Sequence, residues 1–217
     1  MGFKLYGYWR SSASYRVRIA LNLKNIDYEN IAVHLVNNGG EQRSEAYQLL
    51  NPSMLVPTLV DDDTGITLNQ SLAIIEYIDE KFPSPHLLVP SSTVDRAVVR
   101  MIAQDIACDV QPLANLRVLN TLKSDFNADE KAVKKWAADC ISAGFKAVEK
   151  RLTACAGEYA FGDSISLADI CIVPQVYNAS RFGVDMAQFP IINKVYCNCQ
   201  KLSEFINALP ENQADAS

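Results

Sequence analysis

The chain has 217 residues, of which 49% are apolar and 21% charged, the composition of an ordinary globular protein. Its net charge of −5 argues against a nucleic-acid partner, because binding phosphates requires a surplus of lysine and arginine. No stretch approaches the roughly 18 apolar residues that a membrane-spanning helix needs, and the first residues show no leader pattern. A cytoplasmic protein is therefore expected.

Strand and helix patterns alternate in the first part of the chain. Strand patterns cover residues 4–8, 29–35, 58–60 and 66–68, and helical patterns cover 14–24, 44–50 and the stretch that begins at Ser71. The last two strands flank the turn 61–65 and are predicted to form a hairpin. The order β-α-β-α-β-β-α predicts a thioredoxin-like α/β unit with a mixed sheet.

Only helical patterns follow the prolines at 83 and 85, which stop helix propagation. We therefore predict a thioredoxin-like domain over 1–83, a linker over 84–92 and an all-helical domain over 93–217. The helical patterns cover residues 94–120, 129–153, 167–179 and 191–206. Ser166 and Asp169 predict a capping box at the start of the third pattern, and the polar segment after Pro210 is predicted to fray.

The six cysteines all lie in the second half of the chain, mostly on apolar helical patterns. This placement favours reduced, largely buried thiols. Cys197 and Cys199 are spaced too tightly for the usual zinc pair, and neither histidine is near them in sequence. No metal site is expected.

The first candidate site is the stretch 10–16, between the first predicted strand and the first predicted helix. A helix start presents unpaired N–H groups and the positive end of the helix dipole, so it favours an anion. Serine hydroxyls in this stretch can donate to a thiolate; lowering a thiol pKa by about 2 units requires about 2.7 kcal/mol. The alternative is that Ser11, Ser12 or Ser14 simply caps the helix.

Two further candidate sites follow in the α/β unit. Pro57 directly precedes a predicted strand and suits a bulge or a cis turn, which would leave the backbone of Val56 free to pair with an extended peptide. Ser71, at the predicted N-cap of the last helix of the unit, can turn its hydroxyl toward a ligand carboxylate, with Gln70 beside it. An ordinary turn proline and an ordinary capping serine are the alternatives.

These three sites, in this order on a β-α-β-α-β-β-α unit, resemble the glutathione-binding domain of glutathione transferases. The chain is similar to the zeta class in particular, whose signature is Ser-Ser-Cys-x-aromatic-Arg-Val-Arg. The similar stretches of the first half are SSASYRVRIAL (11–21), IDYE (26–29), NPSMLVPTL (51–59) and NQSLAIIEYIDE (69–80). Those of the helical half are VQPLANL (110–116), GDSISLAD (162–169) and VPQVYNASRF (173–182).

The resemblance implies roles for individual residues. Ser11 would stabilise the thiolate of glutathione, with Ser12 beside it and Arg16 near the same helix start as a candidate for catalysis and substrate binding. The residues implied to hold the rest of glutathione are Gln42, Val56 and Pro57 for the peptide portion, Gln70 and Ser71 for the γ-glutamyl carboxylate, and Gln111 and Asn115 from the helical domain. Arg181 would bind a substrate carboxylate, since a guanidinium holds carboxylates bidentately, or would form a salt bridge.

The resemblance also implies an activity. We expect a homodimer that uses glutathione as cofactor for the cis–trans isomerisation of maleylacetoacetate, a small dicarboxylate, in phenylalanine and tyrosine catabolism. The alternatives are a maleylpyruvate isomerase, a transferase acting on small α-halo acids, and a non-catalytic scaffold. Ala13 stands where the zeta signature has cysteine, so any duty of that thiol is absent and the signature defines the substrate range less closely.

Overall fold

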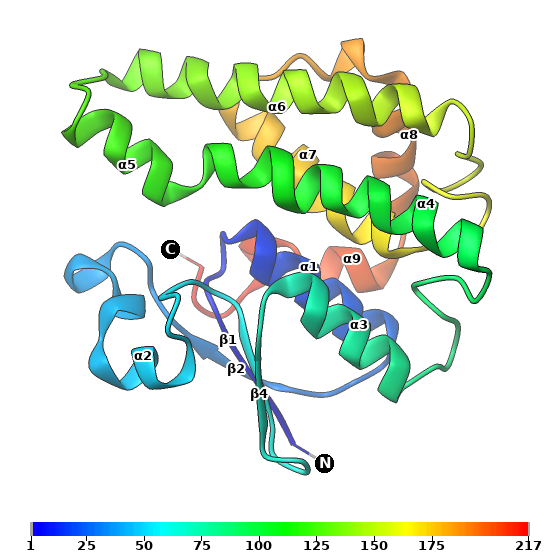
Figure 1. Cartoon of the computed structure of the whole chain (residues 1–217), viewed down its shortest axis with the longest axis horizontal. Helices are drawn as coiled ribbons and strands as arrows, with labels where there is room; N and C mark the ends of the chain where they lie inside the picture. The colour runs from blue at the N-terminus through cyan, green and yellow to red at the C-terminus, as the bar shows by residue number, and fades with distance from the viewer. Residues whose placement is uncertain (1, 217) are drawn as a thin grey trace. The chain divides into compact units, whose positions relative to one another are not determined.

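The computed structural model describes residues 2–216 and divides into two compact units (Figure 1). One unit holds the chain up to Leu87 together with the segment from Lys201 onward, and the other holds Leu88–Gln200. The sequence placed that last segment in the helical domain. The structure differs because the short helix α9 (Ser203–Asn207) packs on α1 (Ser12–Leu23).

A four-stranded mixed sheet forms the centre of the first unit. Its strands, in the spatial order β2-β1-β3-β4, are β1 (Phe3–Gly7), β2 (Glu29–Ala32), β3 (Thr58–Asp61) and β4 (Ile66–Asn69). Strands β1 and β2 pair in parallel, whereas β1 with β3 and β3 with β4 pair antiparallel. The predicted order of elements, the mixed sheet and the hairpin are confirmed.

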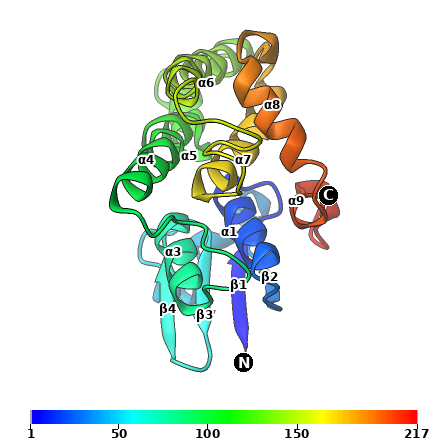
Figure 2. The same cartoon turned by 90° about the vertical axis from the view of Figure 1, so that its right-hand side faces the viewer.

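The helices of this unit are α1, α2 (Glu45–Leu50), α3 (Ser71–Lys81) and α9, with 3₁₀ turns at Asn37–Gly39 and Glu41–Arg43. Helices α1 and α3 lie side by side along the sheet (Figures 1 and 2). A buried ion pair joins them, because Lys24 at the end of α1 lies 2.6 Å from Asp79 of α3. The turns that lead into α1 and α3 carry predicted site residues.

The C-terminal half of α3 is also hydrogen-bonded to the sheet. Asp61, at the end of β3, is only 1% exposed and accepts hydrogen bonds from Tyr77 (2.5 Å) and Lys81. Burial alone would raise the pKa of Asp61, but these bonds and one from the Asp63 amide outweigh burial and lower the pKa to about 2. The carboxylate is therefore ionised, and it anchors the C-terminal half of α3.

The second unit is helical. Its α-helices are α4 (Thr93–Gln104), α5 (Leu116–Ser124), α6 (Glu130–Leu152), α7 (Leu167–Phe182) and α8 (Pro190–Cys199). Helix α7 contacts α4, α6 and α8. Most of its side chains are buried, as expected for a helix that is apolar on most of its surface. Within residues 2–216, no helix is long and apolar enough to cross a membrane.

Two of the predicted helical patterns are interrupted. The pattern 94–120 contains α4, a π-helical turn (Asp105–Val110), a 3₁₀ turn (Gln111–Ala114) and α5. Proline at position 112 cannot continue an α-helical ladder, and Gly144 of α6 lets the π turn approach, since a Cβ there would lie 2.0 Å from Val110 Cγ2. The pattern 191–206 breaks between α8 and α9.

The predicted capping box at the start of α7 is confirmed. The carboxylate of Asp169 accepts hydrogen bonds from Ala160 N (2.7 Å), Ser166 N (2.9 Å) and Ser166 Oγ (2.9 Å). Burial raises the pKa of Asp169 to about 6, against the opposing effect of these hydrogen bonds. The start of α7 is thus closed by its own side chains.

Candidate functional site

The turn between β1 and α1 places Ser11 at the helix start. Ser11 is the N-cap of α1, and its Oγ accepts a hydrogen bond from Ser14 N at 3.2 Å. Ser11 N donates to Tyr8 O at 3.0 Å, which closes the turn. The predicted capping role is therefore present. It uses a lone pair of the hydroxyl and leaves the hydroxyl proton for a further acceptor. Ser12 is the first residue of α1 and is 7% exposed.

Arg16 connects the two helix starts. It lies one turn into α1, is 2% exposed, and its Nη1 donates to Ser71 Oγ at 3.2 Å. The prediction put Arg16 near the start of α1; its contact is with the first residue of α3. Because Ser71 Oγ accepts from a cation, its own hydroxyl proton is available to an anion.

The start of α3 differs from the prediction. The N-cap is Gln70, not Ser71, and no side-chain hydrogen bond caps this helix. Gln70 is exposed and has φ 71° and ψ 113°, a conformation that side-chain-bearing residues rarely adopt. Such backbone strain is concentrated at functional sites. The first amides of α3 are thus open to a ligand anion.

The loop before β3 carries the predicted strand-pairing site. The Val56–Pro57 peptide is cis, one of the conformations that the sequence left open. Leu55 O accepts from Tyr47 Oη (2.7 Å) and Asn51 Nδ2 (2.6 Å), which fixes the loop on one side. Within residues 2–216, no hydrogen bond engages the amide or the carbonyl of Val56. This backbone segment can pair with an extended peptide.

A small apolar cluster joins these elements. Its buried members are Tyr8, Trp9, Val33, Tyr47 and Val56. The cluster therefore packs the β1–α1 turn against the loop that presents Val56. Gln42 lies in the neighbouring 3₁₀ turn, and its Oε1 is buried without a hydrogen-bond partner among the described residues. An unsatisfied buried acceptor fits a residue that binds a ligand.

Two residues next to Ser11 and Ser12 received no role from the sequence. Arg10 directly precedes Ser11, is half-buried, and its guanidinium lies 5.1 Å from the centre of the Trp9 ring. The position of Arg10, a cation directly before an anion-binding turn, could have indicated its role from the sequence. Ala13, in the first turn of α1, brings no polar group to the site.

The remaining predicted residues lie on the helical unit. Gln111 begins the 3₁₀ turn before α5, and Asn115 caps α5 by accepting from Arg117 N at 2.8 Å. Arg181, in the last turn of α7, is exposed; its Nη1 donates to Asn178 Oδ1 (3.2 Å) and its guanidinium lies over the ring of Phe182. Their roles toward a ligand stay predictions.

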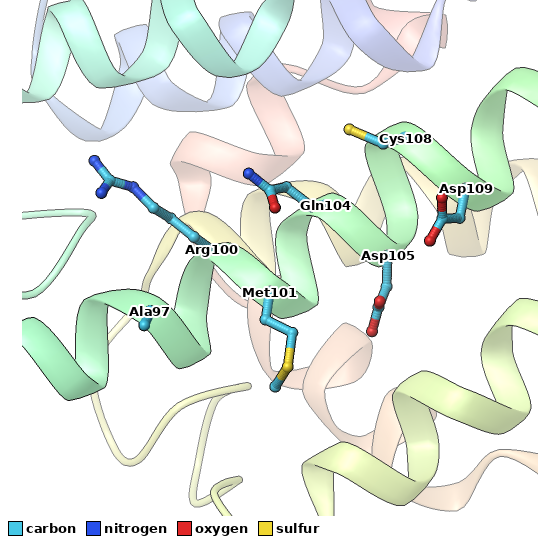
Figure 3. A pocket seen from close by; sticks show the side chains of 7 residues that line it. All are labelled: Ala97, Arg100, Met101, Gln104, Asp105, Cys108 and Asp109. Carbon is cyan, nitrogen blue, oxygen red and sulfur yellow. The ribbon is translucent and has the colours of Figure 1, made fainter.

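A shallow hollow on the helical unit is lined by none of the predicted site residues. Its lining residues are Ala97, Arg100, Met101, Gln104, Asp105, Cys108 and Asp109, all on α4 and the π turn (Figure 3). Arg100, Gln104 and Cys108 extend from one side of this helical stretch, and Met101 and Asp105 extend from the other (Figure 3). Groups of three or more residues suited to bind a metal ion do not occur within residues 2–216.

Comparison with known proteins gives consistent results. The model of the glutathione S-transferase N-terminal domain matches residues 5–86, and that of the C-terminal domain matches residues 115–213. A probable maleylacetoacetate isomerase of Vibrio cholerae is 47% identical over 100% of this chain and 99% of its own.

Two solved structures extend the comparison. A maleylpyruvate isomerase in holo form, described as a bacterial zeta-class glutathione S-transferase, superposes with a TM-score of 0.93 at 44% identity, covering 99% of this chain and 100% of its own. A maleylacetoacetate isomerase of Methylobacterium extorquens AM1 with bound malonate and glutathione has a TM-score of 0.90 at 34% identity, covering 99% of each chain.

Proposed function

The chain belongs to the zeta class of the glutathione S-transferase family, and from this premise we propose that it converts maleylacetoacetate into fumarylacetoacetate with glutathione as cofactor. This reaction is a step in phenylalanine and tyrosine breakdown. One observation carries the proposal: the starts of α1 and α3 each present a serine hydroxyl whose oxygen already accepts a protein hydrogen bond. Both hydroxyl protons are therefore available to anionic groups.

Glutathione fits this arrangement, since it is an extended peptide with a γ-glutamyl carboxylate at one end and an ionisable thiol in the middle. When bound, it supplies a thiolate that adds to the cis double bond, permits rotation about the resulting single bond, and leaves again unchanged. The protein's task is to hold glutathione, keep its sulfur ionised, and orient the substrate.

The start of α3 would bind the γ-glutamyl carboxylate. Ser71 donates its hydroxyl proton, the first amides of α3 donate beside it, and the Gln70 side chain completes the contact. Arg16, buried behind Ser71, adds positive charge and fixes the direction of the Ser71 hydroxyl. Arg16 thus acts on the carboxylate through Ser71 in this proposal.

The peptide portion would pair with the backbone of Val56, as an added strand pairs with a sheet edge. The cis Pro57 that follows places no N–H in competition with this pairing. Gln42 supplies a side-chain contact from the adjacent 3₁₀ turn, which satisfies its buried Oε1 through the ligand amide.

The start of α1 would stabilise the thiolate. The Ser11 hydroxyl donates to the sulfur, and the amides of Ser12 and Ala13 add the field of the helix start. A thiol pKa about 2 units lower than in water requires about 2.7 kcal/mol, which one charge-assisted hydrogen bond and a helix dipole can supply. Ser11 is the residue on which the chemistry depends most directly.

Cations would orient the dicarboxylate substrate. Arg10 lies beside the thiolate turn and is proposed to bind one carboxylate. For the helical unit, we retain Arg181 as a carboxylate ligand and Gln111 and Asn115 as further ligand contacts; these roles, like the homodimer and the cytoplasmic location, rest on the family resemblance.

A maleylpyruvate isomerase is the second candidate, favoured by the similarity to the solved enzyme of that name. Both substrates carry a cis double bond conjugated to a carbonyl, so the thiolate site serves either. Parallel kcat/KM measurements with maleylacetoacetate and maleylpyruvate, in the presence of glutathione, decide between them. A higher kcat/KM for maleylpyruvate would overturn the first assignment.

The central test is Ser11→Ala, with Ser92→Ala as the matched control. Ser92 is the N-cap of α4 and accepts from Asp95 N at 3.5 Å, so both variants lose the same kind of cap. We expect each to lose about 1 kcal/mol of stability. Only Ser11→Ala should lose turnover, by roughly 10- to 100-fold, because one charge-assisted hydrogen bond contributes about 1.5–3 kcal/mol. Equal turnover in the two variants would remove Ser11 from its role.

A further inference from the structure

The last described residues reach back to the turn that carries Ser11. Asp215 Oδ2 accepts a hydrogen bond from Trp9 N at 3.0 Å, across 206 positions of sequence. The segment is held in place by Gln213, whose Nε2 donates to Asn207 O (3.0 Å) and Leu209 O (2.8 Å). The prediction that the residues after Pro210 fray is therefore wrong. The partners of Gln213 are near in sequence, whereas Trp9, the partner of Asp215, is far away in sequence.

The other side of Trp9 is held by Arg18. Arg18 is 1% exposed; its Nη2 donates to Trp9 O (2.9 Å) and its Nε donates to Ala208 O (3.1 Å). Burial lowers the pKa of Arg18 to about 10, and the nearby charge of Asp215 and the hydroxyls of Tyr28 and Tyr15 oppose this shift. Asp215 thus serves as hydrogen-bond acceptor for Trp9 and as counter-charge for Arg18.

Trp9 is a central residue of the turn closed by the hydrogen bond from Ser11 N to Tyr8 O. The conformation of such a turn depends on the φ and ψ angles of its two central residues, which for Trp9 are set by the peptide groups on its two sides. Asp215 fixes the peptide group that carries Trp9 N, and Arg18 fixes the next one through Trp9 O. Both constraints act on Trp9, two positions before Ser11.

We infer that Asp215, acting with Arg18, is a positioning residue for the thiolate site: it locks the Tyr8–Ser11 turn so that the Ser11 hydroxyl and the first amides of α1 converge on the sulfur of glutathione. This inference rests on the proposed function. It gives the segment that follows α9 a part in the chemistry.

Asp215→Ala, Asp215→Asn and the control Glu211→Gln test the inference. Glu211 is an exposed carboxylate on the same segment, and asparagine retains a carbonyl acceptor for Trp9 N while losing the charge. For each variant we would measure the pKa of the bound glutathione thiol from its thiolate absorbance, the pH profile of kcat, and the Kd of S-methylglutathione, which cannot ionise.

We expect Asp215→Ala to raise the bound-thiol pKa by about 0.5–1 unit, which is about a three- to tenfold loss of thiolate below that pKa. The kcat profile should move to higher pH by the same amount, and the Kd of S-methylglutathione should change less than about twofold, since the carboxylate and peptide contacts are elsewhere. Asp215→Asn should behave like the parent protein, as should Glu211→Gln. If Asp215→Ala does not fold, Asp215→Ser, whose hydroxyl is too short to reach Trp9, replaces it.

Two results would overturn the inference. An unchanged bound-thiol pKa in Asp215→Ala would show that the contact is structural only. A lowered pKa in both Asp215→Ala and Asp215→Asn would show that the carboxylate acts only as a negative charge near the sulfur. Failure of the parent protein to bind glutathione with an ionised thiol would instead refute the proposed function, so the two failures are distinguishable.

Discussion

The starts of α7 and α3 solve the same problem in opposite ways. Every helix begins with amides that lack intrahelical partners. At α7, Ser166 and Asp169 satisfy these groups with a buried capping box. At α3, no side chain caps the helix, and the N-cap residue Gln70 has positive φ. The closed start serves the core, and the open start is suited to a ligand.

The comparison also shows how an uncapped helix is kept in place. Helix α3 is anchored through its C-terminal half, where Asp79 pairs with buried Lys24 and where Tyr77 and Lys81 bind Asp61. Its start therefore need not contribute to stability. A helix secured at one end can leave the amides at its other end for binding.

The largest expected effect is at the closed start. Asp169→Ala leaves the buried amides of Ala160 and Ser166 without acceptors, and we expect a loss of about 3 kcal/mol in the free energy of unfolding, measured by urea titration. The exposed N-cap of α6 provides the control: Asp129→Ala, which loses the bond to Ala132 N, should cost about 1 kcal/mol. Equal losses of stability in the two variants would show that the buried capping box of α7 contributes no more than the exposed cap of α6.

The next effect is at the open start. Ser71→Ala removes a hydroxyl that would donate to a carboxylate, so the Kd of S-methylglutathione should rise about 10- to 100-fold in calorimetry, as expected for a bond to a charged group. Ser166→Ala is the matched variant at α7. It should lower stability and leave this Kd unchanged. A similar Kd for both would mean that α3 does not hold the carboxylate.

The anchoring of α3 predicts a pH dependence. The pKa of Asp61 falls from 3.8 to about 2 on folding, so its contribution to stability is present above pH 4 and is lost as the pH falls toward 2. This contribution is about 2 kcal/mol. Asp61→Asn should lack this part of the acid dependence in unfolding titrations at pH 5 and pH 2.5, and the exposed neighbour Asp62→Asn should retain it. A parent protein that loses no more stability than Asp61→Asn over this range would contradict the anchor.

The smallest expected effect is that of a substitution at Gln70, the N-cap of α3. Gln70→Gly relieves the positive φ, so we expect a gain of about 0.5–1 kcal/mol in unfolding free energy together with weaker glutathione binding. Asn25→Gly, at the other end of α1 with φ 52°, should bring a smaller gain and no change in binding. A less stable Gln70→Gly variant would argue that the strain is absent.

Most of the fold could be predicted from local sequence patterns. The hairpin, the parallel β1–β2 pair with its α1 crossover, and the Ser166–Asp169 box each depend on residues close in sequence, and each was predictable. The interruption of the pattern 94–120 was not, because a π turn against Gly144 depends on packing between α6 and the 105–110 segment. Apolar periodicity does not contain that information.

The candidate site was predictable residue by residue but not as a network. Ser11, Val56 and Ser71 were found from turn chemistry and from the family resemblance. The bond between Arg16 and Ser71 spans 55 positions, and that between Trp9 and Asp215 spans 206. Long-range pairs of polar groups leave no local pattern, so the sequence did not indicate the contact of Arg16 with Ser71, and Asp215 was predicted to lie in a frayed segment.

The first unit has a consequence for synthesis. Because its last piece follows the whole helical unit in sequence, a nascent chain presents α1 before Ala208 and Glu204 exist to accept from Arg18 and Asn22. Tyr15, whose hydroxyl donates to Phe205 O and which is buried in the folded protein, also lacks this partner for that interval. The first unit, most of which is synthesised before the helical unit, is therefore completed after it. Until then its exposed apolar surface is available to chaperones.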